Sequence, residues 1–417
     1  MHRGLTLSIF LLSLATLVFG QSKNTAYEDS HVRFTIISGQ TIRMEYSPDG
    51  KFTDAKTLMA VDREYSPTEY KVKTSGKYLE ILTHDIKLRY LKNSGAFTSS
   101  NLSIESAKDN AFKFLWKPDM KQQRNLKGTR HAYDAVKGRT VMYGKDEGKV
   151  LELEDGLIAR DGWTLIDDSK TPLFVEDKDW HGHEITKEWL SSRPDNGSQD
   201  WYFLAYGNDY KSALKDFISF AGPIPMLPSY AYGNWHSWYW LYSDGEFREM
   251  LENYRRNGIP LDVLCIDMDR HINGWYGWDW NTDLFPDPAK MFRDFHRDHL
   301  KLTTNMHIDA MYSNESSFPL IQKDLGADST KTDTLALNLA SSFFTREIDK
   351  MYELGWDFLW DDNGAYATPA EYPGIDMNLW RERLFFEDNA ARGKRPLYLG
   401  RYGGLGGHRY PVGFSGD

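Results

Sequence analysis

The chain has 417 residues, of which 41% are hydrophobic, and a chain of this length favours two domains over one. Its formal net charge is −10 and it contains no long basic run, so nucleic acid is not expected as a partner. Aromatic residues make up 14% of the chain and include 14 tryptophans, a content found in ordinary cores and also in proteins whose ring faces stack on sugars.

Residues 1–20 have the features of a secretory signal peptide. A positively charged start precedes an apolar stretch at 5–19, and Val18 and Gly20 supply small residues at −3 and −1 of a cleavage site. The stretch is too short to indicate a membrane span, so we expect a secreted or periplasmic product without a span after cleavage. The single cysteine, Cys265, excludes an internal disulfide framework, and its apolar neighbours predict a buried side chain.

Residues 21–222 are predicted to form a β-sandwich. Alternating or nearly alternating apolar residues predict strands at 32–37, 41–46, 78–83 and 86–91. Turn signals such as Pro48-Asp-Gly and Asn93-Ser-Gly separate these strands, and such regular spacing is typical of a sandwich. Helical spacing over 210–220 predicts a helix that closes the domain.

Residues 223–417 begin with a proline-rich linker and then change to alternating strands and helices. The predicted strands are 231–235, 263–267, 302–307, 358–361, 397–400 and 412–415. Helices are predicted after a capping box at Ser243 and Glu246, and over 288–300, 343–354 and 380–389. Because such alternation indicates a parallel sheet, we predict the first six units of a (β/α)8 TIM-type barrel, left incomplete.

Several of the predicted barrel strands end in carboxylates: Asp267 and Asp269, Asp309 after His307, Asp361 and Asp362, and Asp417. One such aspartate is usually a cap or an ion-pair partner, but a barrel carries its catalytic groups at the C-terminal ends of its strands. The Asp-x-Asp and His-x-Asp spacings are also compatible with a metal site, because strand residues two apart face the same way. No other feature supports a metal, so neither a metal nor a cofactor is expected.

These motifs resemble those of glycoside hydrolase family 31, a group of retaining α-glucosidases, α-xylosidases and their relatives. The resemblance extends from about residue 30 to the end of the chain. It is carried by segments 34–50, 153–163, 258–269, 280–288 and, most specifically, 408–417. An ordered set of this kind is far more specific than any one of its members.

The resemblance implies roles for individual residues. The nucleophile falls on Asp361, with Asp362 as the adjacent alternative, because the chain lacks the family's usual Met-Asn-Glu continuation. The general acid/base falls on Asp417, which ends the Phe-Ser-Gly-Asp motif. The residues implied to bind substrate are Asp267, Arg401, Trp240 and His307. Each of these four has a purely structural role as its alternative.

The implied function is a retaining, exo-acting α-glycoside hydrolase of the α-glucosidase type, with an oligosaccharide or α-glycoside as substrate. An α-xylosidase, an α-galactosidase-type hydrolase and a non-catalytic carbohydrate-binding protein are the alternatives. The chain stops at the expected acid/base, so the resemblance also implies a fragment that lacks the family's last two barrel strands. The parent protein can therefore be active even if this polypeptide alone is not.

Overall fold

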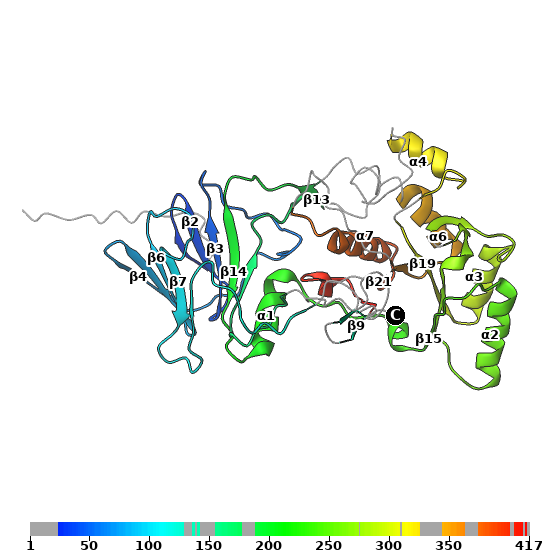
Figure 1. Cartoon of the computed structure of the whole chain (residues 1–417), viewed down its shortest axis with the longest axis horizontal. Helices are drawn as coiled ribbons and strands as arrows, with labels where there is room; N and C mark the ends of the chain where they lie inside the picture. The colour runs from blue at the N-terminus through cyan, green and yellow to red at the C-terminus, as the bar shows by residue number, and fades with distance from the viewer. Residues whose placement is uncertain are drawn as a thin grey trace, which may run out of the picture.

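The computed structural model describes residues 24–128, 136–137, 140–141, 155–176, 188–274, 276–308, 311–325, 344–362, 374–400, 404–411 and 413–414. A β-rich N-terminal part and a second part with alternating strands and helices follow one another along the chain (Figure 1). The predicted signal peptide lies outside the described residues. Within these ranges, no helix combines the length and the apolar character needed to cross a membrane.

The N-terminal part contains two five-stranded antiparallel sheets (Figure 1). The first has the order β1 (Thr25–Glu28), β2 (Val32–Ile36), β3 (Thr41–Tyr46), β14 (Gln199–Leu204) and β11 (Thr164–Asp167). The second has the order β4 (Lys71–Ser75), β5 (Tyr78–Leu82), β6 (Ile86–Leu91), β7 (Leu102–Ser106) and β8 (Leu115–Trp116). Phe34, Leu88 and Phe203 lie fully buried in a core that both sheets share. The predicted β-rich N-terminal domain is therefore confirmed.

Two hairpins and one helix complete this part of the chain. The hairpins are β9 (Val136–Lys137) with β10 (Thr140–Val141), and β12 (Leu173–Glu176) with β13 (Glu188–Ser191). Helix α1 (Tyr210–Ala221) begins after Asp209, whose side chain accepts a hydrogen bond from the N–H of Ser212. The ring of Phe220 stacks on Tyr202 of the first sheet with 4.3 Å between centroids. The predicted helix over 210–220 is thus present.

The second part is built on a parallel sheet whose strands follow chain order. The order is β15 (Trp235–His236), β16 (Val263–Ile266), β19 (Lys301–Met306), β20 (Leu359–Asp361) and β21 (Tyr398–Gly400). Every neighbouring pair is parallel. Among the described residues, the sixth predicted strand is represented by a parallel bridge from Gly413 to Gly400. These strands form an open sheet in which barrel closure is not seen.

Helices connect the parallel strands. They are α2 (Asp244–Arg256), α3 (Pro288–Arg297), α4 (Phe318–Leu325), α6 (Asp349–Leu354) and α7 (Met377–Ala391). A π-helical segment, Phe344–Ile348, leads directly into α6. The capping box is present at α2, because Ser243 Oγ accepts from the N–H of Glu246 and the Glu246 carboxylate accepts from the N–H of Ser243. Helix α4 was not predicted from the sequence.

The first barrel strand differs from its prediction at 231–235. Residues Ser229–Tyr232 instead form a 3₁₀ turn, and the strand is limited to Trp235–His236. Asn234 sets this start, because its N–H donates to the Asp262 carboxylate at 2.9 Å and its carbonyl accepts from Val263. Pairing with the next strand therefore begins only after Asn234.

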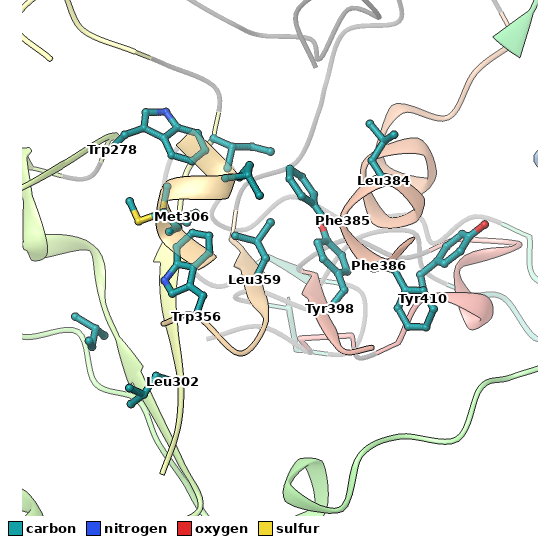
Figure 2. Close-up of a cluster of buried hydrophobic side chains, with 14 of the residues drawn as sticks. Trp278, Leu302, Met306, Trp356, Leu359, Leu384, Phe385, Phe386, Tyr398 and Tyr410 are labelled. Atoms are coloured by element: carbon teal, nitrogen blue, oxygen red, sulfur yellow. The ribbon is translucent and has the colours of Figure 1, made fainter. Parts of the chain in front are cut away.

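Alternation along the strands separates the two faces of the parallel sheet. Leu302, Leu359 and Tyr398 point toward the helices and belong to the largest buried cluster (Figure 2). Cys265, Trp360 and their neighbours Val263, Phe358, Leu397 and Leu399 form a separate cluster on the inner face. A cavity of about 450 Å³ lies against this inner face. Successive strand residues therefore belong to opposite faces, as strand geometry requires.

The two parts of the chain share buried contacts. Leu58 and Phe174 of the N-terminal part belong to the largest hydrophobic cluster of the second part. Arg409, in the 3₁₀ turn Gly407–Arg409 after β21, donates hydrogen bonds to the carbonyls of Leu58, Met59 and Ala221. The segment that follows β21 is thereby attached to the N-terminal domain.

Candidate active site

Strand β20 presents two adjacent aspartates, at and just after its C-terminal end, to opposite faces of the sheet. Leu359 lies in the helix-facing cluster and Trp360 in the inner-face cluster. By alternation, Asp361 belongs with Leu359 and Asp362 with Trp360. The hydrogen bonds of the two carboxylates agree with this assignment.

Asp361 is held on the helix-facing side. Its Oδ1 accepts a hydrogen bond from Nη2 of Arg381 on α7 at 2.6 Å, and its Oδ2 accepts from the hydroxyl of Tyr398 on β21 at 2.9 Å. The carboxylate is only 3% exposed. This placement is at odds with the expectation that Asp361 attacks a substrate, because both oxygens are bound on the side of the sheet that the helices cover. The adjacent alternative that the sequence left open, Asp362, lies on the other face of the sheet.

Asp362 faces the inner side together with Asp267. The Nδ2 of Asn305 donates to Oδ1 of Asp267 at 2.9 Å and to Oδ2 of Asp362 at 2.8 Å. The Nε2 of His307 lies 3.7 Å from the same Asp362 oxygen. Asn305 and His307 both project from β19 and its C-terminal end, two residues apart, so one strand presents both to the same face. The predicted residues Asp267 and His307 are thus brought together beside Asp362.

The environment of Asp267 favours its protonated form. Burial raises the pKa of this carboxyl to about 6, and the nearby Asp362 and Asp269 add to the rise. Hydrogen bonds from the N–H of Met268 and from Asn305 act in the opposite direction. A carboxyl with such a pKa is more common at a functional site than in a purely structural position.

A hairpin that the sequence prediction missed lies next to this cluster. It consists of β17 (His271–Asn273) and β18 (Tyr276–Trp280), and the ring of Tyr276 lies 5.2 Å from that of His307. The side chain of Glu315 holds the hairpin by accepting from the N–H of Trp278 at 3.1 Å. An Asn-Gly pair at 273–274 is a hairpin signal that could have revealed it.

Of the predicted site residues not yet mentioned, the structure describes Trp240 alone. Trp240 lies on the segment after β15 and is 59% exposed, as are its neighbours Trp238, Tyr239 and Leu241 to similar degrees. Arg401 and Asp417 lie outside the described residues. Within the described ranges, no group of three His, Cys, Asp or Glu side chains could hold a metal ion. Asn305 is the residue of the cluster that the sequence prediction left out.

The cluster combines two carboxylates, an amide and an imidazole at the C-terminal ends of β16, β19 and β20. In parallel α/β sheets, this is the edge at which barrel enzymes carry their active sites. Paired carboxylates are suited to attack at a sugar carbon and to accept hydrogen bonds from sugar hydroxyls. The cluster therefore has the position and the residue types expected of an active site at the C-terminal edge of a parallel sheet.

Comparison with known families agrees. Residues 224–417 match the model of the glycosyl hydrolases family 31 TIM-barrel domain. The second part of the chain, residues 224–417, is therefore similar to the TIM-barrel domain of glycoside hydrolase family 31.

Similarity to individual proteins is partial. An α-xylosidase from Saccharolobus solfataricus is 26% identical over 223 residues, which cover 52% of this chain and 28% of that protein. The lysosomal α-glucosidase of Mus musculus is 31% identical over 149 residues, which cover 36% of this chain and 14% of that protein. The matches thus span about a third or less of these relatives.

Solved structures show the same fold. A family 31 dextranase from Flavobacterium johnsoniae, in complex with glucose, superimposes with a TM-score of 0.62 at 16% identity and covers 93% of this chain and 54% of its own. A family 31 α-xylosidase from a soil metagenome, complexed with xylose, gives a TM-score of 0.62 at 14% identity, covering 93% and 65%. Both support a β-rich N-terminal domain followed by a TIM-barrel domain.

Proposed function

We propose that the protein containing this chain is a retaining α-glycoside hydrolase in which Asp362 is the nucleophile and Asp417 the general acid/base. The observation that carries the proposal is the bridge from Asn305 to Asp267 and Asp362 on the inner face of the sheet. Asp362 replaces Asp361 in this proposal because it shares a face with Asp267 and His307. Similarity to this family supports the reaction class.

The proposed chemistry is a double displacement. The ionised Asp362 attacks the anomeric carbon, and the glycosidic bond breaks as Asp417 gives its proton to the leaving oxygen. A water then loses its proton to Asp417 and displaces Asp362, so two inversions retain the α configuration. Asp267 binds sugar hydroxyls, and Asn305 keeps its carboxylate directed toward the substrate. Arg401, His307 and Trp240 keep their proposed substrate-binding roles.

The sugar is proposed to be glucose, with xylose as the second candidate. Two α-xylosidases and several α-glucosidases are among the relatives, so both sugars are kept as candidates. A panel of aryl α-glucosides, α-xylosides and α-galactosides, assayed with the full-length gene product, distinguishes these. If soluble, folded protein binds oligosaccharides but cleaves no member of the panel, the non-catalytic alternative is correct.

The decisive experiment compares Asp362→Ala with Asp361→Asn in the full-length protein. Asp362→Ala should lose activity by at least about 10³-fold and form no glycosyl-enzyme intermediate, because it removes the attacking oxygen. Asp361→Asn should retain measurable turnover.

For Asp417→Ala, activated aryl glycosides should be affected less than poor leaving groups, and azide should give an α-glycosyl azide. Active Asp362→Ala beside inactive, folded Asp361→Asn would reverse the assignment, and an early β-configured product would exclude retention.

Export is proposed as well. Cleavage after Gly20 would give a mature protein that begins at Gln21, in the periplasm or the medium. Mass spectrometry of the N-terminal peptide tests this, and a mature extracellular protein that keeps residues 1–20 would contradict it.

A further inference from the structure

Asp361, the residue directly before the proposed nucleophile Asp362, has a buried carboxylate that side chains from two other elements contact. Asp361 ends β20, Arg381 comes from α7, and Tyr398 comes from β21. The Arg381 Nη2 and the Tyr398 hydroxyl each bind one oxygen of Asp361, at 2.6 Å and 2.9 Å. Burial, and then Asp361 itself, hold the pKa of Tyr398 well above its usual value, so its hydroxyl stays a donor.

We propose that Arg381 and Tyr398, acting through Asp361, are positioning residues for Asp362, and that Arg381 neutralises Asp361 so that Asp362 can ionise beside it. The proposal rests on the proposed function, because it assigns the nucleophile to Asp362. It assigns no contact with substrate to Asp361, Arg381 or Tyr398.

The positioning part follows from strand geometry. Consecutive Cα atoms lie about 3.8 Å apart, so fixing the Asp361 side chain on one face fixes the direction of the Asp362 side chain on the other. The N–H of Asp362 donates to the carbonyl of Met306 at 3.0 Å, which extends pairing with β19 to this residue. Gly400 pairs with Asp361, and a Cβ there would lie 2.5 Å from the Tyr398 ring. The absence of a side chain at Gly400 therefore gives the Tyr398 ring the room it occupies beside Asp361.

The electrostatic part follows from the short separation of two like charges. At about 8 Å and an effective dielectric constant of about 20, an uncompensated Asp361 would shift an ionisation at Asp362 upward by about 1.5 pH units. The ion pair with Arg381 removes most of this repulsion. Glu382, adjacent to Arg381, does not compete for it, because burial, and then Asp376 and Asp361, hold the Glu382 pKa well above its usual value. The raised pKa of Glu382 favours its neutral form.

The other charged or titratable groups that face this region are few among the described residues. They include Asp267, its neighbour Asp269 and His307 around Asp362, and Glu382, Asp376 and Arg409 on the helix-facing side. None of these is altered in the experiment below, so a change in the pH profile reports on Asp361 and Arg381.

The test measures the pH dependence of kcat/KM in the full-length protein with an activated aryl α-glycoside. Such a substrate needs little help from the acid/base, so the acidic limb reports ionisation of the nucleophile. Arg381→Met should move that limb upward by about 1.5 pH units, and the double variant Arg381→Met/Asp361→Asn should return it to within about 0.3 units of wild type. Arg381→Lys should keep the limb in place while kcat falls, because it keeps the charge but not the geometry.

Arg383→Met is the matched control, because Arg383 is equally buried on α7 but pairs with Glu387 and lies over the Phe174 ring. It should cost stability without moving the limb. Folded Arg381→Met with an unmoved limb, or a double variant that keeps the shifted limb, would overturn the proposal. If Arg381→Met does not fold, an Arg381→Lys protein with a shifted limb would overturn it equally. Activity in Asp362→Ala would instead refute the proposed function on which it rests.

Discussion

Arg409 offers a direct test of how the N-terminal domain is attached to the barrel. Its Nη1 donates to the carbonyl of Ala221 at 2.6 Å and to that of Met59 at 3.3 Å, and its Nη2 donates to the carbonyl of Leu58. Ala221 is the last residue of α1, where carbonyls lack helical partners and the helix dipole favours a cation. The preceding residue of the turn, His408, donates from Nε2 to the carbonyl of Gly222 at 2.9 Å.

Replacing Arg409 by Met removes three charge-assisted hydrogen bonds and leaves three acceptors without this donor. At about 1.5 kcal/mol for each bond, the expected loss is about 4.5 kcal/mol of unfolding free energy. Met occupies part of the space of the Arg side chain, so a large cavity adds little to this figure. For a chain of this length, about 4.5 kcal/mol corresponds to a decrease of about 5 °C in Tm.

Differential scanning calorimetry is the assay, with Arg297→Met as the control. Arg297 is 76% exposed and pairs with Asp294 on the same helix, so its loss should change stability by no more than about 0.5 kcal/mol. Arg409→Met should also expose the segment after α1 to limited proteolysis. If the Tm of Arg409→Met lies within about 1 °C of the Tm of the control, these hydrogen bonds do not hold the domains together.

Two further predictions concern the inner face of the sheet. Because the folded-state pKa of Asp267 is about 6, above that of an unfolded chain, the folded protein binds more protons and loses stability as pH rises through this range. The free energy of unfolding of Asp267→Asn, measured in urea, should therefore exceed that of wild type by about 2 kcal/mol at pH 7 and by little at pH 4. A difference that does not depend on pH would show that the raised pKa of Asp267 is not its cause. Burial, and then Asp267, raise the pKa of the Cys265 thiol, so iodoacetamide should modify Cys265 only after denaturation, and rapid labelling of the native protein would refute its burial.

The sequence by itself determined the order and kind of most elements. Alternation predicted the β-rich first part, and capping and helical spacing predicted α1, α2, α3 and α7 close to their observed bounds. These signals are local, since each depends on residues within one or two turns of the chain or along a single strand. The strand-end carboxylates were likewise visible from the sequence, because an apolar run that stops at Asp needs no partner to be recognised.

Only the tertiary structure decided which of the two carboxylates lies on the inner face of the sheet. Asp361 and Asp362 are neighbours of the same type, and a shift of one residue in strand register exchanges their faces. The decision came from distant partners: Arg381 and Tyr398 bind Asp361 on the helix side, and Asn305 joins Asp362 to Asp267 on the other. Such partners lie 20 to 57 residues from the aspartate they bind, so no local pattern encodes them. Periodicity therefore located the strand end, and long-range hydrogen bonds determined which of its two aspartates lies on the inner face.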